Sequence, residues 1–208
     1  MLENIYEASV RDPSGFWTEA ARAIDWEEFP RLALERAGAS GASWFADGRL
    51  NTCCNAVDRH VRQGRGAQRA LVYDSPMTGA CRTYTFAELQ RAVELAAGAI
   101  REQGVGIGDR VVLYMPMIPE AVIAMLACAR LGAVHSVVFG GFAAPELAKR
   151  IDDARPQLLI AASCGLEPKG AVAYKPALDA ALASARHHVP PCLLLQRPQL
   201  QAPMTAGR

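Results

Sequence analysis

Two adjacent glycines, Gly140 and Gly141, lie where a parallel α/β sheet would bind a ligand. They belong to the run Phe139–Phe142, which follows an apolar stretch and precedes a helical pattern. The carboxyl ends of parallel strands border the ligand crevice in such sheets, and glycine lets a backbone approach a ligand closely. A tight turn that needs positive φ is the alternative, and the motif alone favours this turn.

A second glycine-rich stretch, Gly104-Val105-Gly106-Ile107-Gly108, resembles half of a dinucleotide-binding fingerprint. It follows a helical pattern and precedes a strand pattern, whereas phosphate binding needs the glycines ahead of a helix N-terminus. We interpret it as a helix end and a turn. A Rossmann-type dehydrogenase is disfavoured because no glycine-rich loop joins the first strand to its helix.

The six cysteines and four histidines show no metal-ligand spacing. No Cys-x-x-Cys pair occurs, so we expect no zinc site. The adjacent Cys53 and Cys54 could be redox-active, but buried packing thiols are commoner, and Cys128 and Cys164 lie in apolar segments predicted to be core. His135 opens a strand and is predicted to be structural. This cysteine set suits a reducing cytoplasm.

A predicted βαβαβ unit positions these residues. Three apolar runs without alternation predict parallel strands buried on both faces, over Val111–Met115, Val134–Phe139 and Leu158–Ala161. The fold class is therefore α/β, with right-handed crossovers.

Two helical patterns separate the strands. The first opens at Pro119 and ends at Gly132, and the second opens at Pro145 and ends before Pro156. The predicted buried positions are Val122, Met125, Leu126 and Ala129 on the first helix and Leu147 and Ile151 on the second.

A hairpin and a helix precede this unit. The hairpin is predicted over Ala70–Asp74 and Cys81–Thr85, and Thr85 with Glu88 forms a capping box. The helix ends at Gly104. Its predicted buried stripe is Leu89, Val93, Ala96 and Ile100.

Beyond the unit, Cys164–Gly170 is predicted to be a loop at the carboxyl end of the third strand. A helix over Pro176–Ala185 and a strand over Cys192–Leu195 follow, and the tail from Arg197 is predicted to be disordered. At the other end, residues 1–62 are irregular, with a helix start at Asp12-Pro13 and a short helix over Ala56–Val61. A polar connector, Gln63–Gln68, follows them.

Charge and hydropathy exclude several classes of protein. The 208 residues include 22 basic and 21 acidic side chains, a net charge of +1, and 51% hydrophobic residues. This near-neutral charge does not indicate binding to nucleic acid, and no polybasic run indicates binding to a membrane surface. No apolar run could span a bilayer, and no signal or transit peptide is recognisable.

Three colinear segments resemble the acetyl-CoA and propionyl-CoA synthetases of the AMP-forming, adenylate-forming superfamily. They are Tyr114–Ala121, Met125–Ala133 and His135–Phe142. The Asn55–His60 segment in the cap is similar to the same family, and to its propionate–CoA ligase branch in particular. The resemblance implies the first part of the large N-terminal domain of an adenylate-forming enzyme, with residues 1–62 as its cap and residues 63–208 as a truncated AMP-binding domain.

The resemblance implies a two-step reaction. ATP and a short-chain carboxylate, propionate or acetate, form an acyl-adenylate and pyrophosphate, and the CoA thiol then displaces AMP to give the acyl-CoA. The family's Thr-Ser-Gly-Thr-Thr-Gly phosphate loop, which works with magnesium, does not occur in this chain. Its adenine pocket and C-terminal lysine also lie downstream in the family. We therefore expect no catalytic residue in this chain and no activity from it alone.

One CoA-binding element of the family does fall inside the chain. In the family the loop after the third strand contacts CoA as Gly-Ile-Glu-Pro-Gly-Arg, which matches Gly165–Gly170. The candidate CoA-binding residues are therefore Glu167, Pro168, Lys169 and Gly170, with Gly141 and Arg150 as weaker candidates. Lys169 replaces the family's glycine and Gly170 its arginine, so the positive charge moves by one residue. A solvated loop lysine is the alternative for Lys169.

Two hypotheses stay open on this evidence. The chain is the N-terminal portion of a synthetase, or it is a free-standing CoA-binding or interaction module that kept the fold without the chemistry. Such a module could pair with a separately encoded C-terminal part.

Overall fold

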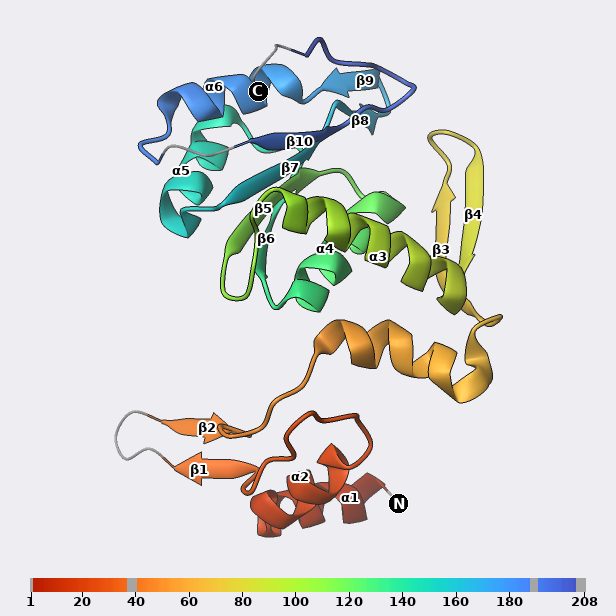
Figure 1. Cartoon of the computed structure of the whole chain (residues 1–208), viewed down its shortest axis with the longest axis vertical. Helices are drawn as coiled ribbons and strands as arrows, with labels where there is room; N and C mark the ends of the chain where they lie inside the picture. The colour runs from red at the N-terminus through yellow and green to blue at the C-terminus, as the bar shows by residue number, and fades with distance from the viewer. Residues whose placement is uncertain (1, 37–40, 188–190, 205–208) are drawn as a thin grey trace. The chain divides into compact units, whose positions relative to one another are not determined.

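The computed structural model describes residues 2–36, 41–187 and 191–204 (Figure 1). The chain divides into two compact units, Met1–Arg59 and His60–Arg208. Among the described residues, no helix combines the length and the apolar character that crossing a bilayer requires.

The first unit consists of short elements joined by aromatic contacts. It contains α1 (Leu2–Arg11), α2 (Pro13–Ala21), the antiparallel pair β1 (Leu34–Arg36) and β2 (Ala42–Trp44), and the π-helical turn η2 (Cys54–Asp58). Asp12 caps α2 by accepting a hydrogen bond from the Gly15 backbone at 3.0 Å, which confirms the predicted helix start. The ring centroid of Trp26 lies 5.6 Å from that of Phe45 and 6.0 Å from that of Phe29. Aromatic pairs therefore link the segments between these short elements.

The second unit is an α/β layer built on a parallel sheet. It begins with the π-helical turn η3 (Val61–Arg65), the antiparallel hairpin of β3 (Arg69–Ser75) and β4 (Ala80–Thr85), and α3 (Phe86–Glu102). The elements that follow are β5 (Arg110–Met115), α4 (Pro119–Leu131), β6 (Val134–Phe139), α5 (Ala144–Ala154), β7 (Leu158–Ala162), β8 (Cys164–Glu167), β9 (Gly170–Ala173), α6 (Lys175–Ser184) and β10 (Cys192–Leu195).

The parallel sheet has the strand order β10-β7-β5-β6. The chain steps from β5 to β6 on one side and then crosses back over β5 to β7 on the other. Right-handed crossovers in opposite directions place α4 and α5 on opposite faces of the sheet. The order therefore reverses between β5 and β7, and this reversal is the point at which open α/β sheets form a ligand crevice.

One face of the sheet packs against α5 and α6. The buried cluster on that face contains Val112, Tyr114, Val138, Leu147, Ala148, Ile151, Leu159, Ala161, Tyr174, Leu178 and Ala181. α3 packs against α4. Thr85 and Glu88 form the predicted capping box at the start of α3, and Gly132 ends α4 with φ of 71°, also as predicted.

Two predictions about burial are wrong. β6 is an edge strand rather than a strand buried on both faces, and Val134, Val137 and Phe139 are 55%, 53% and 63% exposed. On α4, the predicted stripe is only half-buried. The buried residues of α4 are Pro119, Ala121, Ile123, Ala124, Ala127 and Cys128. This helix is apolar on nearly every side, so periodicity could not identify its core face.

Smaller differences concern one buried position on α3, the length of one helix and the structure of one loop. Ala97 rather than Ala96 is buried on α3. Helical residues extend to Arg65, so the helix predicted over Ala56–Val61 includes part of the predicted connector. The predicted loop Cys164–Gly170 is a hairpin made by β8 and β9. Strands of four residues are too short to give a recognisable alternation.

The tail was predicted to be disordered, but its first part is anchored to the sheet. The Arg197 backbone N–H donates to Ser163 Oγ at 2.9 Å, and Ser163 Oγ donates to the Leu200 carbonyl at 2.7 Å. Residues 205–208 of the predicted disordered tail lie outside the described residues.

Candidate functional site

The carboxyl ends of the four parallel strands lie along one edge of the sheet. β5 leads into Pro116–Ile118, β6 into Gly140–Ala143, β7 into Ser163 and the β8–β9 hairpin, and β10 into Gln196. The sequence predicted this edge as the ligand-binding side, and every candidate residue except Arg150 lies on its loops.

Tyr174 is the residue around which this edge is packed. It follows β9 and is 8% exposed. A β-carbon on Gly140 would lie 2.6 Å from Tyr174 Cζ, and one on Gly165 would lie at the same distance from that atom. The Tyr114 ring is 5.1 Å away between centroids, and its hydroxyl donates to the Phe142 carbonyl at 3.0 Å. Burial raises the pKa of Tyr174, so its hydroxyl stays neutral.

The structure corrects the reason predicted for the glycine pair. The predicted turn is confirmed, since the Phe142 backbone N–H donates to the Phe139 carbonyl at 3.0 Å. Neither Gly140 nor Gly141 adopts positive φ, so the predicted reason for having glycines in this turn is wrong. The Tyr174 ring occupies the space beside Gly140, and the Phe139 ring occupies the space beside Gly141, where a β-carbon would lie 2.8 Å from Phe139 Cε1. Within the described residues, aromatic packing therefore accounts for both glycines.

The four main CoA candidates form the tip of the β8–β9 hairpin. Glu167, Pro168, Lys169 and Gly170 are all exposed. Lys169 forms no ion pair with any residue in the described part of the chain, so its ammonium is available to a ligand. Gly170 has φ of 126°, a conformation that L side chains rarely adopt. An arginine at this position, as in the family pattern, would strain this hairpin.

Arg150 is not brought to the hairpin tip. It is exposed on α5, more than a turn beyond the Gly140–Gly141 loop, and its charge acts on Glu146 of the same helix. The structure therefore unites Gly140 and Gly165 around Tyr174 but leaves Arg150 apart from the hairpin.

Two residues at this edge were missed by the sequence reasoning. Tyr174 was not singled out, although it stands just before a helix that begins with Lys175-Pro176. Arg197 was assigned to a disordered tail, yet it is 7% exposed. An arginine two residues after the apolar strand Cys192–Leu195 was the available signal.

Three of the six thiols, those of Cys53, Cys128 and Cys164, are buried, whereas Cys81 is exposed. Cys128 and Cys164 are fully buried, as predicted, and burial raises the pKa of Cys128 to about 11. Such a thiol stays protonated near neutral pH and is a poor nucleophile. Among the described residues, no three His, Cys, Asp or Glu side chains lie together as ligands for a metal ion.

Comparisons with known proteins identify the family. Residues 57–205 match the family described as AMP-binding enzyme, and residues 2–56 match the acetyl-coenzyme A synthetase N-terminus. An uncharacterised protein of Pseudomonas aeruginosa is 52% identical over 200 residues, which cover 96% of this chain and 32% of that protein.

Two named relatives give the same picture. The propionate–CoA ligase of Escherichia coli is 43% identical over 207 residues, covering 100% of this chain and 33% of the ligase. The human mitochondrial acyl-CoA synthetase short-chain family member 3 is 44% identical over 204 residues, which cover 98% of this chain and 30% of that synthetase. The chain thus spans about a third of the length of the curated relatives it matches. Both family matches, in their order along the chain, show that it belongs to the short-chain acyl-CoA synthetase family and corresponds to its N-terminal portion.

Proposed function

We propose that this chain is the N-terminal part of an AMP-forming short-chain acyl-CoA synthetase that acts on propionate or acetate. The observation that carries the proposal is the colinear match of residues 2–56 and 57–205 to the two family segments. Residues 1–62 would form the cap and residues 63–208 the first part of the AMP-binding domain. The six free thiols suit a cytoplasmic location.

Of the two chemical steps, this chain holds residues suited only to the second. In the first step, the carboxylate would take the adenylyl group of ATP and release pyrophosphate, and magnesium would neutralise the phosphate charge. The 208 residues contain no Thr-Ser-Gly-Thr-Thr-Gly run, so we assign none of them to that step. In the second step CoA must be held near the adenylate, and the β8–β9 hairpin is the element of this chain suited to that task.

The hairpin would bind CoA through charge rather than through a shaped cavity. Lys169 is exposed at the tip, beside Pro168, and carries a point charge suited to a phosphate. Glu167 is exposed next to it and opposes a phosphate, which weakens the contact. We therefore expect CoA to bind this chain weakly.

Replacing Lys169 by alanine should weaken CoA binding about fivefold, because one charge-assisted contact of roughly 1 kcal/mol is lost. Titration calorimetry with CoA measures the change. Arg91→Ala, which removes one exposed charge from α3, is the matched control and should leave the affinity unaltered. Equal affinities for wild type, Lys169→Ala and Arg91→Ala would make Lys169 a solvated surface residue.

A second candidate function is a module that pairs with a separately encoded C-terminal part. The exposed edge strand β6 favours it, since Val134, Val137 and Phe139 present apolar surface beside an unpaired backbone edge. Another polypeptide that adds a strand to this edge would bury that surface.

A chimera tests the main proposal. The matching N-terminal segment of the Escherichia coli propionate–CoA ligase is replaced by residues 1–208 of this chain, since the match covers the chain completely. The chimera should form propionyl-CoA from propionate, ATP and CoA, whereas the ligase without the segment should not. A chimera that melts cooperatively like its parent, yet neither exchanges pyrophosphate nor forms propionyl-CoA, would contradict the proposal.

A further inference from the structure

A pocket of about 370 Å³ opens beside the segments that follow β5 and β10, at the carboxyl edge of the parallel sheet. Its walls come from the β3–β4 hairpin, the start of α4 and the segment after β10. The lining residues that carry charge are Arg82, Glu120 and Arg197. None of the hairpin residues proposed to contact CoA lines it. Because ligands of open α/β sheets bind outside the carboxyl ends of the strands, general topology also favours a ligand at this edge.

Arg197 is a buried cation without a counterion. The residue is 7% exposed, and its Nη1 donates to the Cys164 carbonyl at 3.0 Å. Its guanidinium makes no other hydrogen bond and no ion pair with any residue in the described ranges. A guanidinium has five N–H donors, and its Nε and Nη2 donors form a parallel pair that suits a carboxylate or phosphate. These two donors are not among the buried side-chain atoms that lack a partner, so they are accessible to a small ligand.

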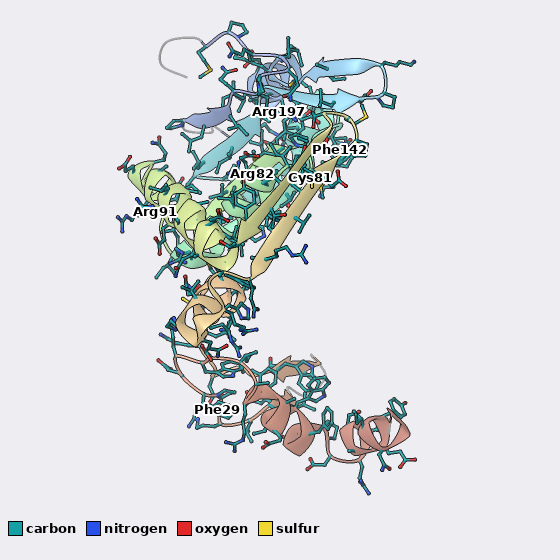
Figure 2. The ribbon with its side chains drawn as sticks, turned by 90° about the vertical axis from the view of Figure 1, so that its right-hand side faces the viewer. Phe29, Cys81, Arg82, Arg91, Phe142 and Arg197 are labelled. Carbon is teal, nitrogen blue, oxygen red and sulfur yellow. The ribbon has the colours of Figure 1, made fainter. Side chains whose placement is uncertain are left out.

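The pocket carries a second cation. Arg82 is exposed on β4. Its Cζ lies 4.2 Å from the centroid of the Tyr84 ring, so a cation–π contact holds the guanidinium over that ring. Figure 2 shows Arg82 on the hairpin, Arg197 beside the carboxyl-terminal segment, and Arg91 on α3. The N-terminus of α4, a helix of 13 residues, adds positive potential, since Ile118 provides no side-chain cap.

Glu120 is the one acidic side chain in the lining, and it does not neutralise Arg197. It lies in the first turn of α4, and it forms no ion pair with Arg82 or Arg197. Its charge acts on Tyr84, whose pKa is raised first by burial. Two cations against one carboxylate leave a net positive pocket, with room for a ligand that carries an anionic group.

We propose that this pocket binds an oxyanion, a carboxylate or phosphate group, through the Nε and Nη2 edge of Arg197, with Arg82 as the second charge. The inference does not depend on the proposed function, because it rests on the buried arginine, the cavity and the topology. The two guanidinium donors provide a bidentate contact, so an arginine is required here and a lysine is not equivalent.

The test uses the isotope-labelled chain and nuclear magnetic resonance of the arginine Nε–H groups. Sodium propionate and sodium phosphate are titrated in separate arms, with sodium chloride holding the ionic strength constant. We expect saturable shifts of the Arg197 Nε–H resonance and of the Gln196 and Gln199 amides in at least one arm. The arm with the lower dissociation constant identifies the group as a carboxylate or a phosphate.

Three variants decide between a built site and nonspecific attraction. Arg197→Lys keeps the charge but loses the bidentate contact, and should weaken binding about tenfold or more. Arg82→Gln, at an exposed position, should weaken it about threefold, and Arg91→Gln should not change it. Shifts that rise linearly in both arms, or an Arg82→Gln titration identical to that of Arg91→Gln, would overturn the proposal even if Arg197→Lys fails to fold.

Discussion

Replacing Gly165 by alanine should lower the free energy of unfolding of the second unit by about 2–3 kcal/mol, the range typical of overpacking. The new β-carbon would lie 2.6 Å from Tyr174 Cζ, well inside van der Waals contact. Tyr174 cannot move away easily, since it is 8% exposed and packs against Tyr114 at 5.1 Å. Urea unfolding followed by circular dichroism measures the loss as a lower midpoint at an unchanged slope.

A glycine on α3 provides a control of opposite sign. Gly98 lies inside the helix, and a β-carbon there would meet nothing within 4 Å. Gly98→Ala should therefore raise stability by about 0.5–1 kcal/mol through helix propensity. A double-mutant cycle with Tyr174→Leu should also show that Gly165→Ala costs much less once the phenol ring is removed. An unchanged midpoint for Gly165→Ala alone would refute the packing role of Tyr174.

Local signals in the sequence were sufficient to locate most helices and strands of the second unit. Apolar runs located β5, β7 and β10, and the Thr85–Glu88 capping box and Gly132 located helix ends within a residue or two. Each of these features depends on nearby residues alone, through backbone hydrogen bonds or a glycine conformation.

The errors arose where distant parts of the chain decide the outcome. The exposure of β6 depends on its place at the edge of the sheet, which its own residues do not encode. The core face of α4 is chosen by α3 and the sheet, because the helix is apolar on nearly every side. Arg197 is ordered because Ser163 and Cys164, over 30 positions earlier, accept its hydrogen bonds.

The candidate site was predicted only in part. The carboxyl edge of the sheet and the hairpin tip at Glu167–Gly170 follow from strand order and from family resemblance. The role of Tyr174 could not be predicted, since its contacts with Gly140 and Gly165 join residues from separate loops. The oxyanion pocket likewise combines Arg82 and Arg197, which are more than 100 residues apart in the chain.

The largest expected effect concerns adenylation. Stabilising the charge that develops at the α-phosphate as the adenylyl group is transferred requires preorganised donors and a metal ion, which together lower the barrier by many kcal/mol. These 208 residues hold no phosphate loop, and Gly104–Gly108 lies at the end of a helix and ahead of a strand, where it cannot cradle a phosphate. We therefore expect this chain alone to form no acyl-adenylate.

Carboxylate-dependent exchange of labelled pyrophosphate into ATP tests this expectation directly. The purified chain is assayed with propionate and with acetate, beside the full-length Escherichia coli propionate–CoA ligase as a positive control. The predicted result is exchange indistinguishable from a sample without protein, while the ligase exchanges readily. Exchange that persists through purification and is lost on Gly141→Asp would show that this chain holds an adenylation centre of its own, and would contradict the account that adenylation needs segments beyond these 208 residues.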